Sequence, residues 1–67
     1  MDNSKGVGRK IRERRRMLDI NQWELALRVG VTQSYISNVE NGYVLPDNKM
    51  VVAIENALNE NREAVPA

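Results

Sequence analysis

A chain of 67 residues has room for one domain with one small hydrophobic core, which leaves no space for a separate small-molecule effector domain. The sequence contains no cysteine and no histidine, so we expect no disulfide, no metal site, no cofactor and no enzyme. The net charge is only +1, but residues 1–40 carry eight Lys and Arg against five Asp and Glu, which concentrates basic charge in this part of the chain.

The first predicted element is a helix from about Val7 to Leu18. Two glycines near its start weaken the helix there, so residues 1–6 are expected to form an N-terminal arm; Ser4 is an alternative N-cap. Spacings of three or four residues place on one face Val7, Ile11, Arg15 and Leu18. The helix is therefore predicted to carry an arginine on its apolar face.

Two shorter helices are predicted next, from Gln22 to Val29 and from Gln33 to Glu40. Each is bounded by a short polar side chain that suits an N-cap, or by a residue that tolerates the turn at a helix end. These boundary residues are Asn21, Gly30, Thr32 and the Asn41-Gly42 pair. Three residues, one of them a glycine, thus separate the two helices.

A fourth helix is predicted after Pro46, with Asp47 or Asn48 as its N-cap. Asn59 is a suitable residue for its C-terminal end. The inward face of this helix carries Val51, Ile54 and Leu58.

The remaining residues, 60–67, are polar and are expected to form a tail or the start of a linker, with Ala64-Val65 as no more than a short fifth turn. Since no strand pattern is present, the sequence predicts a compact all-α fold of four to five helices, with its domain over residues 7–59. The longest apolar stretch is far too short for a membrane span, and a cytoplasmic, nucleoid-associated location is expected.

Two short helices joined by three residues with a glycine are typical of a helix-turn-helix, which here spans residues 22–41. Apolar positions must lock the helices together, Ala26 must be small where the next helix crosses it, and Gly30 must accept a positive φ. The predicted motif core is Leu25, Ala26, Val29, Gly30, Val31, Ile36 and Val39.

On these residues, the chain resembles the Cro/lambda-repressor-like (XRE) family of helix-turn-helix DNA-binding domains. The resemblance covers about Val7 to Leu58. The matching residues are Gln22-Trp23-Glu24-Leu25-Ala26, Gly30-Val31-Thr32-Gln33-Ser34-Tyr35-Ile36-Ser37, Glu40-Asn41-Gly42 and Pro46. The resemblance implies that the third helix enters the major groove of DNA.

The outer face of that helix carries short amide and hydroxyl side chains rather than the Lys and Glu that suit a solvated helix. Gln and Asn pair with adenine and Ser with several bases, which favours DNA recognition over a helical hairpin that touches no DNA. Ser34 suits a contact with solvent or phosphate equally well. The predicted base-reading residues are Gln33, Ser34, Ser37 and Asn38.

The resemblance also implies contacts with the DNA backbone. Gln22 opens the second helix, where N-terminal amides attract phosphate, and Asn21 is either a further contact or only an N-cap. The basic residues of the first helix are either phosphate contacts or a solvated face. The predicted phosphate contacts are Gln22, Asn21, Tyr35, Tyr43, Arg9, Lys10, Arg14 and Lys49.

Two further roles follow from the resemblance. The arginine on the apolar face of the first helix needs a partner, and the family pattern supplies one, so Arg15 and Glu40 are predicted to form a structural ion pair. Trp23 replaces a residue that is usually polar; it either lies over the DNA backbone or covers the side of the bundle.

The fourth helix departs from the family pattern. Glu55 stands where a small apolar residue is common, and Asn59-Glu60 replaces a usual Gly-Val ending. The apolar cluster from Met50 to Ala53 is too broad for one inward stripe, so part of it, with Val44 and Leu45, is expected to face another subunit.

Together these features predict a regulator of transcription, with repression as the expected effect, that binds a palindromic operator in double-stranded DNA as a homodimer. The alternative is a protein-interaction module of the same fold, an antitoxin or a bridging coactivator, whose main partner is another protein. No membrane and no small-molecule effector is expected as a partner.

Overall fold

The computed structural model describes residues 3–60, and the side chains of residues 6–59. This part of the chain contains four helices and no strand: α1 (Asn3–Met17), α2 (Gln22–Val29), α3 (Gln33–Glu40) and α4 (Asn48–Glu60). The predicted all-α fold is confirmed, and α2 and α3 have the predicted bounds. The fifth turn expected at Ala64-Val65 lies outside the described residues.

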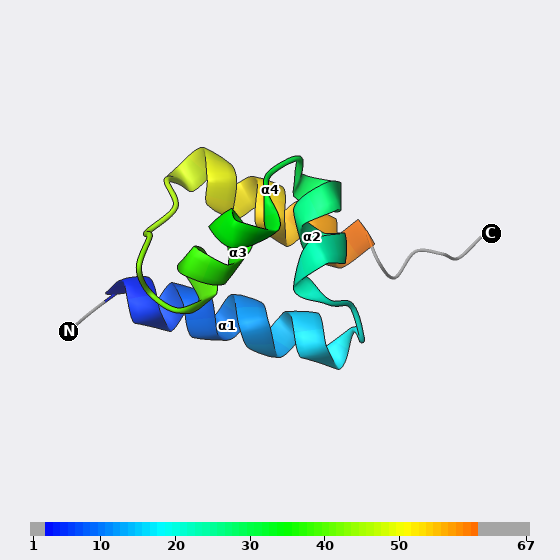
Figure 1. The fold of residues 1–67 in the computed structure, drawn as a ribbon, viewed down its shortest axis with the longest axis horizontal. Helices are drawn as coiled ribbons and strands as arrows, with labels where there is room; N and C mark the ends of the chain where they lie inside the picture. The colour runs from blue at the N-terminus through cyan, green and yellow to red at the C-terminus, as the bar shows by residue number, and fades with distance from the viewer. Residues whose placement is uncertain (1–2, 61–67) are drawn as a thin grey trace.

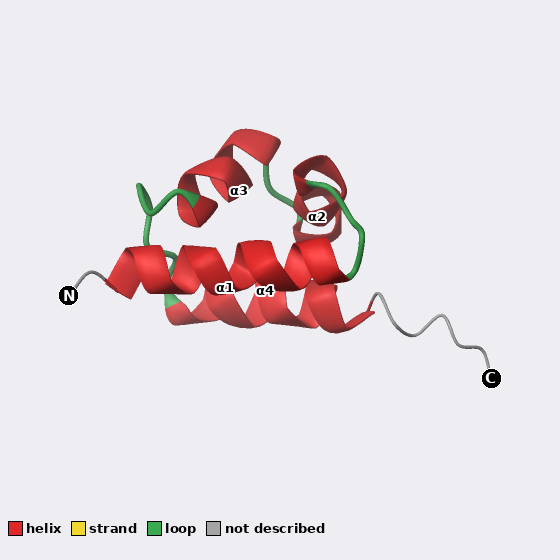
Figure 2. Cartoon of the chain, turned by 90° about the horizontal axis from the view of Figure 1, so that it is seen from below, coloured by secondary structure: helices red, strands yellow, loops and turns green. Residues whose placement is uncertain are grey.

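The helices form two layers. α1 and α4 run side by side, and α2 and α3 pack together on one side of them (Figures 1 and 2). α3 contacts both α1 and α2, so one side of α3 is buried and the other remains at the surface. None of the four helices is long and apolar enough to cross a membrane.

The hydrophobic core lies where the helices meet, and the motif contributes much of it. Its buried side chains are Ile11, Ile20, Leu25, Ala26, Ile36, Val39, Ile54, Ala57 and Leu58. Val29 and Val31 are half-buried and pack against this core, whereas Gly30 is exposed at the turn. Ala26 is 2% exposed, and its small side chain lets α3 pack closely against α2.

The start of α1 differs from the prediction. The helix begins at Asn3, not near Val7, so residues 3–6 are helical, and Ser4 lies inside the helix instead of capping it. The reason lies at Gly8, because a Cβ on this residue would overlap the carbonyl oxygen of Val39 and would lie 2.7 Å from that of Glu40. Gly8 therefore serves the packing of α1 against the end of α3, and this contact outweighs its low helix propensity.

The N-terminus of α4 is capped by Asp47, which settles the choice between Asp47 and Asn48. Its Oδ1 accepts a hydrogen bond from the N–H of Met50 at 2.9 Å. Its carbonyl oxygen accepts one from the N–H of Val51, also at 2.9 Å. α4 is thus anchored immediately after the loop that leaves α3.

Candidate nucleic-acid interface

The turn between α2 and α3 is fixed by local hydrogen bonds. Gly30 has φ 91° and ψ 31°, a left-handed conformation that disfavours a side chain, and its N–H donates to the carbonyl oxygen of Ala26 at 2.8 Å. Thr32 then caps α3, since its Oγ1 accepts a hydrogen bond from the N–H of Tyr35 at 3.0 Å. These bonds hold α2 and α3 in one relative orientation.

The predicted base-reading side chains lie together on the outer face of α3. Gln33, Ser34 and Asn38 are exposed, and Ser37 is half-buried. Ser37 Oγ accepts a hydrogen bond from Asn41 Nδ2 at 3.4 Å. Within the described part of the chain, no hydrogen bond engages the side chain of Ser34 or Asn38. This face therefore has amide and hydroxyl groups that are available to hydrogen-bond with a ligand.

A buried carboxylate connects this motif to α1. Glu40 Oε2 accepts a hydrogen bond from Arg15 Nε at 2.7 Å and Oε1 accepts one from Arg15 Nη2 at 3.0 Å. This ion pair joins side chains that are 0% and 10% exposed, respectively. Glu40 Oε1 also accepts from Gln22 Nε2 at 3.1 Å and from Arg12 Nε at 3.4 Å. Gln22 Oε1 in turn accepts from Gln33 Nε2 at 3.4 Å, so Gln22 links the buried carboxylate to α3's first residue.

Opposing influences act on the pKa of Glu40. Burial raises the pKa, but hydrogen bonds from Arg15 and Gln22, the charge of Arg15 and the hydrogen bond from Arg12 together outweigh burial. The pKa of Glu40 therefore lies below its ordinary value. The carboxyl group is ionised at neutral pH and able to hold both ends of the motif.

This lowered pKa predicts an acid-sensitive fold. A carboxyl group with a lower pKa in the folded than in the unfolded chain stabilises the fold fully above its unfolded pKa of about 4.3, and this contribution is lost as pH falls through the folded pKa. We expect urea unfolding midpoints of the unmodified protein to fall more steeply below about pH 4.3 than those of Glu40→Gln. If the urea midpoints of both proteins fell equally as the pH is lowered, Glu40 would not be the cause of the acid sensitivity.

Four basic residues of α1 divide between two flanks. Arg9 and Arg12 lie beside the C-terminal end of α3, where Arg12 Nη2 donates to Asn41 Oδ1 at 2.8 Å. Arg12 is a candidate phosphate contact that sequence reasoning missed. Its spacing of three residues from Arg9 is the signal that would have grouped the two on one helix flank.

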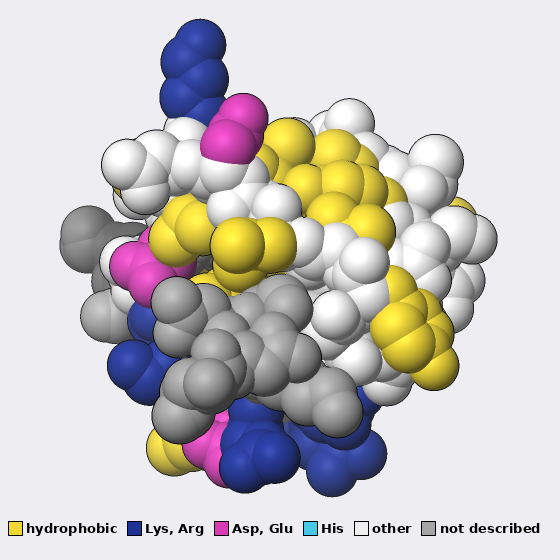
Figure 3. Space-filling view, turned by 90° about the vertical axis from the view of Figure 1, so that its left-hand side faces the viewer, with side chains coloured by type: hydrophobic (Ala, Val, Ile, Leu, Met, Phe, Trp, Pro, Cys, Tyr) yellow, Lys and Arg dark blue, Asp and Glu magenta, His cyan; other side chains and the backbone are white. Residues whose placement is uncertain are grey.

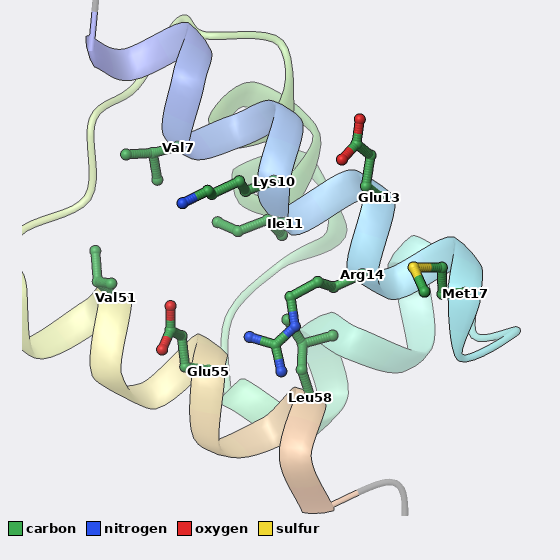
Figure 4. A pocket seen from close by; sticks show the side chains of 9 residues that line it. All are labelled: Val7, Lys10, Ile11, Glu13, Arg14, Met17, Val51, Glu55 and Leu58. Atoms are coloured by element: carbon green, nitrogen blue, oxygen red, sulfur yellow. The ribbon is translucent and has the colours of Figure 1, made fainter.

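The other flank of α1 faces α4. Lys10 and Arg14 line a groove between these helices (Figure 4), and Arg14 Nη2 donates to Asn59 Oδ1 at 2.9 Å. No residue of α2 or α3 lines this groove. The structure thus places these two predicted phosphate contacts apart from the outer face of α3.

The remaining predicted phosphate contacts differ in their surroundings. Asn21 Oδ1 accepts a hydrogen bond from a backbone N–H in the first turn of α2 at 2.8 Å, so Asn21 is the N-cap of that helix. Tyr35 is half-buried; burial, and then the charge of Asp47, raise the pKa of its hydroxyl, which remains a hydrogen-bond donor at neutral pH. Tyr43 in the loop after α3 is 78% exposed, and Lys49 on α4 is also exposed.

Comparison with known protein families agrees with this architecture. A helix-turn-helix family model matches residues 11–64, which include the whole motif. The chain belongs to the Cro/lambda-repressor-like (XRE-type) helix-turn-helix family. XRE-type domains are a family of DNA-binding regulators and not of enzymes.

A relative of this XRE-type domain is the "ImmF control region 10 kDa protein" of Bacillus phage phi105. The two sequences are 32% identical over 59 residues, which is 88% of this chain. The chain spans 66% of the length of that relative. No solved structure matches the chain.

Proposed function

We propose that this chain is a sequence-specific regulator that binds double-stranded DNA, with α3 in the major groove. The observation that carries the proposal is the outer face of α3, where exposed amide and hydroxyl side chains project from a helix fixed by the Gly30 turn and the Glu40 network. A rigidly held row of such groups suits hydrogen bonding to base edges. Similarity to a phage control-region protein supports a regulatory role.

Different residues would contribute affinity and sequence preference. Gln33 and Asn38 have side-chain amides that can pair with adenine through two hydrogen bonds, which gives base discrimination. Gln22 at the start of α2 and the Arg9–Arg12 flank of α1 would contact phosphates, which position the helix on any sequence.

The experiment that tests this proposal selects bound duplexes from a random pool and then titrates the selected duplex and a random duplex at several salt concentrations. We expect Gln33→Ala to cost about 1–3 kcal/mol of discrimination at one base pair, whereas Gln22→Ala should weaken binding to all sequences alike. Asn56→Ala, an exposed substitution on α4, is the matched control and should change neither. Equal affinity for selected and random duplexes at every salt concentration would refute a sequence-specific regulator.

We further propose that two copies bind a palindromic operator and thereby repress transcription. Leu45 and Val52 are each 57% exposed, and hydrophobic side chains gather in the upper half of the face shown in Figure 3, whereas most of its basic side chains lie toward the lower edge. Burial of such side chains would favour dimerisation, and a dimer that binds a palindromic operator has its two α3 helices about 34 Å apart. The same titration should then show two chains bound per selected duplex; saturation with one chain would contradict the dimer.

A second candidate function is that of a protein-interaction module. The groove between α1 and α4 has a volume of about 460 Å³ and an apolar floor that includes Ile11, Val51 and Leu58 (Figure 4). Such a groove suits the apolar face of a partner helix, and a partner there would leave α3 accessible. If one protein partner binds in a fixed stoichiometry and no duplex can be selected from the random pool, this function is favoured over DNA recognition.

A further inference from the structure

Trp23 adjoins the surface that we propose to bind DNA. This side chain is the only tryptophan of the protein and is 59% exposed, although tryptophan is highly buried on average. It lines a shallow depression together with Val31 of the turn and with Gln33 and Ser34 of α3. A large aromatic ring thus lies beside two of the proposed base-reading residues.

The structure does not use Trp23 to cover the bundle. The ring is neither part of the buried core nor among the half-buried side chains that pack against that core. Within the described part of the chain, no group accepts a hydrogen bond from the indole N–H. Both the apolar face of the ring and its N–H donor are therefore available to a ligand.

The position of Trp23 on α2 indicates which part of DNA it would meet. The N–H groups at the start of a helix attract phosphate, and Trp23 is the second residue of α2, directly after Gln22. When α3 lies in the major groove, the preceding helix of this motif lies across the DNA backbone. In that orientation, the depression between Trp23 and Ser34 lies at the edge of the major groove, beside the sugars and phosphates of the DNA backbone.

We propose that Trp23 packs its ring on the deoxyribose of a nucleotide beside the bases contacted by α3, and that its indole N–H donates a hydrogen bond to the adjoining phosphate. This proposal rests on the proposed DNA-binding function. An indole suits such a contact because it combines a large apolar face with a donor at its edge. Since sugar and phosphate are the same at every base pair, the contact adds affinity and leaves base preference to α3.

Intrinsic fluorescence tests this contact directly, because Trp23 supplies all the tryptophan emission. Unlabelled duplex, both the selected and a random sequence, is titrated into the full chain at low salt. Binding of fluorescein-labelled duplexes of the same two sequences is followed in parallel by anisotropy. We expect the tryptophan emission to shift or to be quenched along the same binding curve that anisotropy gives.

Substitutions then measure what the contact contributes. Trp23→Ala should weaken binding of both duplexes by about tenfold, while Trp23→Phe, which keeps a ring and loses the N–H, should weaken it less. Met17→Ala is the matched control, since Met17 is 83% exposed on α1 and lies in the groove facing α4. It should leave both affinities unchanged, and thermal unfolding followed by circular dichroism should show that all variants are folded.

Each other outcome overturns the assignment in a recognisable way. Unchanged emission and unchanged Trp23→Ala affinity, with anisotropy reporting bound duplex, would reject the contact and leave the DNA-binding function intact. A loss confined to duplexes with thymine at one position would replace the sugar-phosphate contact with a contact to a thymine methyl group. Failure of the unmodified protein to bind any duplex would reject the proposed function and the role of Trp23 with it.

Discussion

Glu40→Ala is expected to lower the free energy of unfolding by about 3–5 kcal/mol, because it removes one member of a buried ion pair and leaves the other unpaired. The Arg15 side chain is 10% exposed. It would retain a hydrogen bond to the carbonyl oxygen of Ile20 at 3.0 Å but lose both bonds to a carboxylate. Small domains have a total stability near the lower end of about 5–15 kcal/mol, so this variant should keep only about 0–2 kcal/mol and unfold at very low urea concentrations.

A second ion pair in the same protein provides the matched control. Glu24 and Arg28 are one turn apart on α2, and Arg28 Nη2 lies 2.8 Å from Glu24 Oε2. The side chains of Glu24 and Arg28 are 43% and 26% exposed, respectively. Glu24→Ala should therefore cost about 0.5 kcal/mol or less. Urea unfolding followed by circular dichroism compares the two variants, and similar losses would contradict a special role for the buried pair.

A variant that replaces both members of the buried pair shows whether Glu40→Ala loses stability because Arg15 is left without a partner or because packing is lost. In Arg15→Met/Glu40→Leu no buried charge is left unpaired, because Arg12, the other cation that contacts Glu40, is 36% exposed and keeps its hydrogen bond to Asn41. The double variant should therefore recover much of the stability lost in Glu40→Ala. No recovery would indicate that the shape of the network, rather than its charge, determines the stability of this end of the motif.

The motif was predictable because its boundaries are set by neighbouring residues. Asn21 and Thr32 accept hydrogen bonds from the helices that they precede, and Gly30 adopts the left-handed conformation that ends α2. These are local preferences that do not depend on the rest of the fold. The bounds of α2 and α3 accordingly agree with the sequence prediction.

Features that depend on contacts between distant residues were not predictable in the same way. The low helix propensity of Gly8 suggested a late start for α1, whereas its backbone lies against that of Val39 and Glu40. Helical spacing puts Arg9 and Arg14 on different flanks of α1, but it gave no indication that one flank would lie beside α3 and the other beside α4. Packing decides both, and it is invisible in local propensity.

Gln22 shows how the structure adds to a role assigned by resemblance. As a phosphate contact it would act alone, but its amide group joins Glu40 at 3.1 Å and Gln33 at 3.4 Å. The longer bond is weak and easily exchanged for a bond to DNA, while the bond to the ionised carboxylate is stronger. The buried carboxylate of Glu40 therefore holds the Gln22 side chain in place, while the carbonyl oxygen of its amide keeps only a weak bond to Gln33.

Gly8→Ala is expected to lower the free energy of unfolding by about 2–3 kcal/mol, although alanine is a better helix former than glycine by about 1 kcal/mol. The added Cβ would meet the carbonyl oxygens of Val39 and Glu40, which are backbone atoms and cannot rotate away as the end of a flexible side chain can. The substitution must push α1 away from the end of α3 or shift Glu40 out of its bonds with Arg15.

Gly6→Ala is the matched control, because Gly6 lies in the same helix and a Cβ there would meet nothing within 4 Å. It should raise the free energy of unfolding by about 0.5–1 kcal/mol through helix propensity alone. Opposite signs for the two glycines in urea unfolding would show that close packing at Gly8 holds α1 against α3. If both substitutions stabilise the protein, that contact does not determine how α1 is positioned, and the Glu40 network must hold the helix without it.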